Sequence, residues 1–169
     1  MVFATGERLA DDNSDVIDHS RPAWLPLGSL LVRERLITPE QLELVLLEQE
    51  QDRSRRLGEI LVEWGWVSSR AIAEALSEQY GIRFLDLELA DVDERAADLL
   101  DDEVAESYQA LPVRFLPDGV LLVAVADPTD VGACDELRDA VPVPIRLVVV
   151  DAVALSRELQ GRRARLRPV

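Results

Sequence analysis

Two acidic residues in one short segment could support catalysis. Asp127 and Asp130 lie in ADPTD, where two carboxylates three residues apart could serve a small hydrolase as an acid and base pair. The same segment joins an expected strand to an expected helix, a place where aspartate commonly caps the helix. No base, nucleophile or metal-binding set accompanies the two acids in the sequence. Capping is therefore the favoured interpretation, and hydrolysis is a remote alternative.

A cluster of arginines precedes a second chemically suggestive stretch. Arg53, Arg55 and Arg56 stand just before Leu57 and Gly58, which begin a predicted helix. Guanidinium groups, the free N–H groups of a helix start and a glycine that allows close approach together suit an anion such as a phosphate. The alternative is that the arginines only neutralise nearby acids and solvate an interhelical loop.

Other side chains that could carry catalysis are scarce. The one cysteine, Cys134, excludes an internal disulfide and has no neighbouring His or Cys, so we expect a buried or half-buried spectator thiol. The one histidine, His19, lies in a polar stretch without a fixed partner. All 18 positive charges are arginines, so the chain has no lysine for a phosphate-binding loop or a Schiff base. We predict no catalytic residues, no metal site and no enzyme.

Composition narrows the class of partner. The net charge of −15 argues against nucleic-acid binding, because a phosphate backbone would be repelled by most of the surface. The longest apolar runs, at 121–126 and 145–150, are far too short to span a bilayer. The N-terminal residues lack the apolar stretch of a signal peptide. We therefore expect a cytoplasmic protein without a transmembrane segment.

An internal repeat positions the arginine cluster. Residues 26–49 (copy one) read PLGSLLVRERLITPEQLELVLLEQ, and residues 56–79 (copy two) read RLGEILVEWGWVSSRAIAEALSEQ. The copies align at an offset of 30, and the apolar residues of each fall at helical spacing in two bursts. Between the bursts of copy one, Thr38, Pro39 and Gln41 form a helix-start signal, and Ser68 is the cap in copy two. Each copy therefore predicts a short helix, a tight turn and a longer helix.

Both long helices end on glutamine. Gln49 and Gln79 occupy equivalent positions, where an amide offers a donor and an acceptor to a heteroaromatic edge. Two equivalent half-sites would suit a two-fold ligand. The alternative is that each glutamine is an exposed residue at a helix end.

The second half of the chain has a mixed pattern that predicts both strands and helices. Residues 83–89 alternate like a short edge strand or an extended linker, and helices are expected over 93–100 and 101–110. A hairpin that turns at 117–119, a helix over 130–140, a strand at 145–150 and a helix at 151–160 follow. The predicted fold class is α+β: a small N-terminal helical bundle of two repeated helical hairpins, then a small α/β sandwich with a three-stranded sheet. The predicted domains are a disordered tail at 1–22, a helical repeat subdomain at 23–82, an α/β subdomain at 83–160 and a basic tail at 161–169.

The repeat pattern resembles the tandem motif of the MshEN domain, the N-terminal domain of type II secretion and type IV pilus assembly ATPases. The later stretch LPVRFLPDGVLLVAVADPTD, with its following helix and strand, is similar to the second half of the same region. The resemblance covers about residues 25–160 and leaves no room for the ATPase core, so it implies a free-standing relative or the N-terminal piece of something longer. The motif positions matched in copy two are Arg56, Leu57, Gly58, Leu61, Val62, Gly65, Val67, Ile72, Leu76 and Gln79.

The resemblance implies a cyclic di-GMP site in the helical part and docking onto a membrane-anchored platform partner. Copy one departs from the motif at Pro26, where arginine is expected, and at Arg35, where glycine is expected. Loss of the first arginine removes a charged contact of roughly 1.5 to 3 kcal/mol, which predicts a degenerate first half-site. The ligand-binding residues carried over are Arg56, Leu57, Gly58, Leu61, Leu76 and Gln79 from copy two, with Leu27, Gly28, Leu46 and Gln49 from copy one.

These observations predict a non-enzymatic regulatory or docking module, with no cofactor and with cyclic di-GMP as the candidate ligand. The alternative is a pure protein–protein adaptor that binds no nucleotide and uses exposed aromatic surface at Trp24, Trp64 and Trp66. The expected partner is a secretion or pilus platform or an associated domain. Such a partner would hold a cytoplasmic protein at the periphery of the inner membrane.

Overall fold

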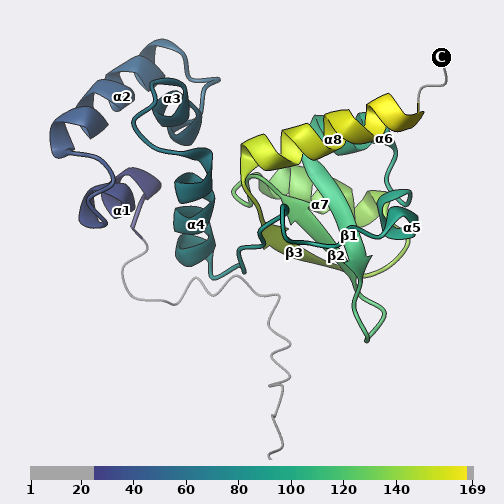
Figure 1. Cartoon of the computed structure of the whole chain (residues 1–169). Coiled ribbons are helices and arrows are strands. Elements are labelled where there is room, and N and C mark those ends of the chain that lie inside the picture. The colour runs from purple at the N-terminus through teal and green to yellow at the C-terminus, as the bar shows by residue number, and fades with distance from the viewer. Residues whose placement is uncertain (1–24, 167–169) are drawn as a thin grey trace, which may run out of the picture.

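The structure is a computed structural model that describes residues 25–166, with two helical hairpins followed by a three-stranded sheet and its helices (Figure 1). The predicted tail at 1–22, together with His19 and Trp24, lies outside the described residues. The elements in chain order are α1 (Leu27–Arg33), α2 (Pro39–Gln51), α3 (Leu57–Glu63), α4 (Ser69–Tyr80), α5 (Glu94–Ala97), α6 (Asp102–Tyr108), β1 (Ala110–Phe115), β2 (Leu121–Val125), α7 (Val131–Ala140), β3 (Ile145–Val149) and α8 (Ala152–Leu166).

The two copies of the repeat fold in the same way. The N–H group of Leu36 donates to the Leu31 carbonyl at 2.9 Å, and at the equivalent position Trp66 donates to Leu61 at 3.0 Å. These bonds close the turn between the short and long helices of each copy. The helical hairpins predicted from the repeat are confirmed.

Copy one keeps this geometry at the two positions where it departs from the motif. Arg35 adopts a left-handed backbone with φ 60°, close to the φ of 72° at Gly65. Pro26 stands before α1 with ψ 148°, and Arg56 stands before α3 with ψ 146°. The substitutions therefore change the side chains without changing the path of the chain, at some backbone strain for Arg35.

The predicted helix-start signals form as expected. The Thr38 hydroxyl accepts from the Gln41 N–H, and the Gln41 side chain accepts from the Thr38 N–H at 2.9 Å. Ser68 accepts from the Ala71 N–H at 3.1 Å. These bonds satisfy backbone donors that a helix start leaves free, so each long helix begins where the sequence predicts.

The two hairpins bury their apolar faces against each other. Leu31, Ile60 and Leu61 are fully buried in one cluster between the helices. Gly28 and Gly58 let the short helices approach the long ones, because an added Cβ would come within 2.5 Å of Leu42 at Gly28 and 3.0 Å of an Ile72 methyl at Gly58. Both glycines have this structural role whether or not a ligand binds.

The sheet has the order β1-β2-β3. β1 pairs with β2 in antiparallel register through a hairpin, and β2 pairs with β3 in parallel register. Gly119 takes the positive φ of 81° that the turn requires. The predicted strand or linker at 83–89 contributes one isolated bridge, between Phe84 and Val149. The predicted α+β class and the three-stranded sheet are confirmed.

Aspartates begin the later helices, as acids at helix starts predict. Asp101 accepts from the Glu103 N–H before α6, and Asp151 accepts from the Ala154 N–H before α8. The predicted basic tail at 161–169 differs from the structure over 161–166, where α8 continues. Arg162 is buried there and donates to Asp98 at 3.0 Å, so a tertiary ion pair holds the end of the helix.

Copy two connects the hairpins to the sheet. Ala73 and Leu76 on α4 pack against Val149 at the end of β3. The Ser69 hydroxyl donates to Asp151 at 2.6 Å, which joins the starts of α4 and α8. α4 is therefore both part of the repeat and the surface on which the sheet region rests. The predicted subdomain boundary near residue 82 stays a prediction.

Candidate ligand-binding cleft

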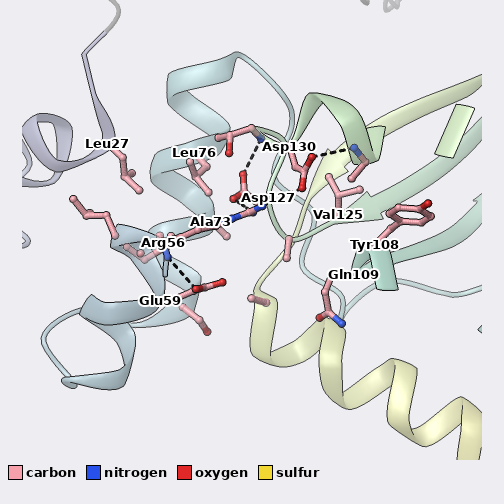
Figure 2. A pocket seen from close by; sticks show the side chains of 18 of the residues that line it. Leu27, Arg56, Glu59, Ala73, Leu76, Tyr108, Gln109, Val125, Asp127 and Asp130 are labelled. Atoms are coloured by element: carbon pink, nitrogen blue, oxygen red, sulfur yellow. Dashed lines mark hydrogen bonds and ion pairs between the residues drawn. The ribbon is translucent and has the colours of Figure 1, made fainter. Parts of the chain in front are cut away.

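A cleft of about 1260 Å³ lies where the helical repeat meets the sheet region. Figure 2 shows side chains from α1, α3 and α4 facing those of the loop after β2. Seven of the ten predicted ligand-binding residues line the cleft: Leu27, Gln49, Arg56, Leu57, Gly58, Leu76 and Gln79. The structure thus brings the predicted motif residues of both copies to one cavity.

Arg56 spans the cleft to the sheet region. Its guanidinium forms ion pairs with Asp127 and, at 3.1 Å, with Asp130. Partial burial works to lower the pKa of Arg56, but the two carboxylates outweigh it and raise the pKa. The side chain is still 45% exposed, so each ion pair contributes little and a competing anion can displace it.

The two aspartates act as turn and cap residues. Asp127 accepts from the Thr129 N–H at 2.7 Å, and Asp130 caps α7 by accepting from the Ala133 N–H at 3.0 Å. The Ala133 N–H, together with Arg56, lowers the pKa of Asp130. A general acid needs a raised pKa, so this environment supports capping and opposes the hydrolase alternative.

The two motif glutamines make equivalent bonds. Gln49 donates from Nε2 to the Arg55 carbonyl at 3.0 Å, just before α3. Gln79 donates from Nε2 to the Leu25 carbonyl at 2.6 Å, just before α1. The long helix of each copy therefore hydrogen-bonds the residue that precedes the short helix of the other copy. The two bonds are related by an approximate two-fold symmetry and need both copies.

Gln79 also holds an unused acceptor. Its Oε1 is buried and has no hydrogen-bond partner among the described residues. Exchanging the amide oxygen and nitrogen would set two acceptors against each other at Leu25, so the observed orientation is the favourable one. A buried acceptor without a partner is destabilising, and the Gln79 side chain lines the cleft, so Oε1 is a candidate acceptor for a ligand N–H group.

Three predicted ligand-binding residues do not line the cleft. Leu61 is fully buried between the hairpins, and Gly28 is buried where α1 packs on Leu42. Leu46 is 43% exposed and does not line the cleft. The apolar period assigns these residues to helices, but it does not say which apolar residues face a ligand and which face a neighbouring helix.

Sequence reasoning missed the partners of Arg56. The sequence indicates only catalytic or capping roles for Asp127 and Asp130, although both line the cleft and pair with the motif arginine. Tyr108 and Gln109 also line the cleft, from the end of α6. The opposite charges of Arg56 and the ADPTD segment were the available signal, but residues more than 70 positions apart cannot be paired from one sequence.

The other arginines of the predicted cluster face elsewhere. Arg55 pairs with Glu48 at 3.2 Å and with Glu63. Arg53 is exposed and does not line the cleft. The interpretation that these arginines neutralise acids holds for Arg55, while Arg56 alone of the three projects into the cleft.

The cysteine and the two described tryptophans differ in their burial. Cys134 is buried, and burial raises the pKa of its thiol, as expected for a spectator. Trp64 is partly exposed and packs edge to face with Trp66, with ring centroids 4.9 Å apart. Trp66 also packs against the core of the hairpins, so Trp64 is the more accessible of this pair.

The described residues offer neither a metal site nor a membrane-spanning helix. Residues 25–166 contain no cluster of His, Cys, Asp or Glu side chains arranged to hold a metal ion. None of the helices in that range has the length and apolarity needed to cross a bilayer.

The fold and the cleft together define a small module in which a tandem helical repeat packs against a three-stranded sheet and its helices. A family model described as the MshEN domain matches residues 80–167, more than half of the chain. The chain therefore belongs to the MshEN domain family. The match falls on the sheet region, whereas the repeat motif lies before it.

Individual proteins extend the similarity into the repeat. The type IV pilus assembly ATPase PilB of Myxococcus xanthus is 34% identical over 134 residues, which cover 79% of this chain and 23% of PilB. The chain thus spans about a quarter of that relative. The structure of MshE with cdg (cyclic di-GMP) superposes with a TM-score of 0.70 at 30% identity and covers 81% of this chain and 98% of that one. The N-terminal domain of XpsE superposes with a TM-score of 0.66 at 25% identity, over 79% of this chain and 91% of that one.

Proposed function

We propose that this chain is a non-enzymatic regulatory and docking module that binds cyclic di-GMP in the cleft between the repeat and the sheet. The observation that carries the proposal is Gln79, whose side chain lines the cleft beside the other motif residues and whose buried Oε1 has no partner among residues 25–166. A guanine edge supplies N–H donors of the kind this acceptor needs. The similarity to MshE with cdg supports the same ligand.

The cleft suits the other parts of a cyclic dinucleotide. Leu27, Leu57 and Leu76 supply apolar surface for bases or riboses, and Arg56 supplies the charge for a phosphate. The cleft volume of about 1260 Å³ leaves ample room for a cyclic dinucleotide. A phosphate would have to compete with Asp127 and Asp130 for the guanidinium, which lowers the net contribution of Arg56 to affinity.

The two half-sites are unequal. Copy two provides Arg56 and Gln79, whereas copy one provides Leu27 and Gln49, with Pro26 at the position of the arginine. We infer that copy one contributes apolar contact and that copy two supplies the charged contact.

The second candidate is a protein–protein adaptor without nucleotide binding. It is favoured by exposed apolar surface on α2, where Leu44 and Leu47 are 52% and 55% exposed. Leu36, just before this helix, is also exposed. Such surface fits a protein partner, and a pilus or secretion platform would place the module at the inner membrane.

Isothermal titration calorimetry with cyclic di-GMP tests the nucleotide proposal. We expect measurable heat for the wild-type chain and a loss of affinity of about tenfold to a hundredfold for Arg56→Ala, because a charge-assisted contact is removed. Arg53→Ala is the matched control, since Arg53 belongs to the same cluster but lies off the cleft, and it should bind as the wild type does.

Absence of heat at near-millimolar ligand, with no change in amide exchange across the repeat, would contradict the nucleotide proposal and favour the adaptor. Equal losses in Arg56→Ala and Arg53→Ala would show that binding reflects general charge rather than the cleft.

A further inference from the structure

A second groove, of about 360 Å³, lies over β3 and extends across the sheet to Leu122 of β2 and Arg114 of β1. Figure 1 shows β3 at the side of the sheet that faces α4. One wall is formed by the end of α4 and residues 80–85, and the other by Val131, Cys134 and Arg138 of α7. The groove shares only Tyr80 and Cys134 with the ligand cleft, so it is a separate surface.

The part of β3 that lines the groove has an open edge. The Leu121 N–H donates to the Pro144 carbonyl, and the Val150 N–H donates to the Val125 carbonyl. The backbone groups of the even-numbered residues of β3 therefore point toward β2 and pair with it. Backbone groups alternate in direction along a strand, so those of Ile145, Leu147 and Val149 point away from β2.

Only the last of these three residues has a partner on the open side. Val149 donates to the Arg83 carbonyl and accepts from the Leu85 N–H, both at 2.9 Å. The pairing stops there, because Phe84 and Val149 form an isolated bridge. Ile145 and Leu147 line the groove with N–H and C=O groups that no described residue pairs, which is the usual template for adding a strand.

The groove is also basic on a strongly acidic protein. Arg83, Arg114, Arg138 and Arg146 all line it, while the whole chain carries a net charge of −15. Arg138 pairs with Asp135, and Arg146 lies 3.6 Å from Asp118. Neither Arg83 nor Arg114 has an ion-pair partner among the described residues, so the groove retains unneutralised positive charge.

Apolar side chains accompany the arginines. Val131 is 60% exposed at the start of α7, and Leu85 and Leu147 lie on the same groove. A free phosphate or a lipid headgroup could use the arginines and the free N–H groups, but it does not present donors and acceptors at the spacing of a strand. An extended peptide has donors and acceptors in alternation and satisfies both kinds of backbone group.

We propose that the groove binds an extended segment of a partner protein, acidic with alternating apolar residues, which adds as a strand beside β3. The open stretch at 145–148 accommodates about four residues at roughly 3.3 Å per residue. Apolar side chains of the segment contact Val131 and Leu147, and its carboxylates meet Arg83 and Arg138. The proposal specifies a surface for the docking part of the proposed function and does not depend on nucleotide binding.

Amide chemical shifts of the full isotope-labelled chain test this proposal. The probe is a synthetic eight-residue peptide of alternating Val and Glu with blocked ends, and the matched peptide replaces Glu with Lys. We expect the Val–Glu peptide to shift the amides of Ile145 and Leu147 downfield, because their N–H groups gain acceptors, and the Val–Lys peptide to leave them unchanged. The same shifts should appear with and without cyclic di-GMP, so this test is separate from that of the cleft.

Two variants separate backbone pairing from general charge. Leu147→Pro removes an N–H on the open edge without removing a bond to β2, and should weaken binding of the Val–Glu peptide about tenfold. Arg83→Glu should weaken it at least about tenfold through like-charge repulsion. Arg95→Glu is the matched control, since Arg95 is exposed on α5, outside the groove, and should bind as the wild type does.

Several outcomes would overturn the proposal. These are equal binding of both peptides, no shift at millimolar peptide, or shifts that fall outside the groove. Shifts of Ile145 and Leu147 on raising the protein concentration alone would assign the edge to a second copy of the chain. Shifts of the same amides in a D11N/D12N/D15N/D18N variant without peptide would assign it to the N-terminal segment of this chain. Shifts with anionic lipid vesicles but with neither peptide would assign it to a membrane surface.

Discussion

The two copies of the repeat have the same backbone and different neighbours. In copy two, Leu76 of α4 is 5% exposed and packs with Ala73 against β3. The equivalent Leu46 in α2 is 43% exposed, and Glu43 stands where Ala73 stands in copy two. The residues that the two copies share therefore determine the hairpin fold. The residues that differ between the copies determine which hairpin packs against the sheet region.

The largest effect should come from breaking that packing. Leu76→Ala removes buried apolar contact with Val149 and should lower the free energy of unfolding by about 2 to 4 kcal/mol. Leu46→Ala, at the equivalent exposed position, should lower it by less than about 1 kcal/mol. Urea denaturation followed by circular dichroism measures both. Equal losses would mean that the two faces are buried alike.

Restoring the missing arginine should reduce the functional difference between the copies. Pro26→Arg returns a guanidinium to the first half-site, at a position whose backbone already matches that of Arg56. If cyclic di-GMP binds as proposed, affinity should rise about tenfold or more in calorimetry. Pro26→Ala, the control for loss of the proline ring, should leave affinity unchanged. Similar affinities for all three chains would argue against a half-site in copy one.

Exchanging the turn residues tests the backbone strain in copy one. Gly65→Arg should destabilise the protein by about 1 kcal/mol, because Gly65 has a left-handed φ and open space around it, so no steric clash adds to the backbone effect. Arg35→Gly should stabilise it by no more than about 1 kcal/mol, since relief of strain is offset by the greater freedom of glycine when unfolded. Thermal denaturation compares the two, and a stable Gly65→Arg variant would show that the turn tolerates either residue.

The smallest effect should be the pH dependence of the ion pair that only copy two makes. The pKa of Asp130 is lowered in the folded state, so its contribution to stability is present above the unfolded pKa of about 3.9 and is lost as pH falls through the folded value. Asp130→Asn keeps a capping oxygen and removes the charge. The stability difference from wild type should be constant between pH 7 and pH 5 and should shrink as pH falls below the unfolded pKa of about 3.9. A difference that does not change with pH on acidification would show that the cap, rather than the charge, carries it.

Much of the fold could be predicted from short-range patterns in the sequence. The caps at Thr38 and Ser68, the turn at Gly119 and the apolar periods of the hairpins depend on residues within a few positions of one another, so one sequence is enough to place them. The same local rules placed α8 but ended it too early. Its last turn is held by the pairing of Arg162 with Asp98, which lies 64 positions away.

The sequence by itself determined the repeat, the helix starts, the α+β class and seven of the ten residues that were predicted to bind a ligand and that line one cleft. Tertiary structure decided that Arg56 pairs with Asp127, that Gln79 keeps a buried acceptor and that part of β3 remains an open edge. The physical reason is the range of the interactions involved. Helix periods and caps act along the chain, whereas ion pairs, orphaned acceptors and free strand edges depend on which distant segments come together and which do not.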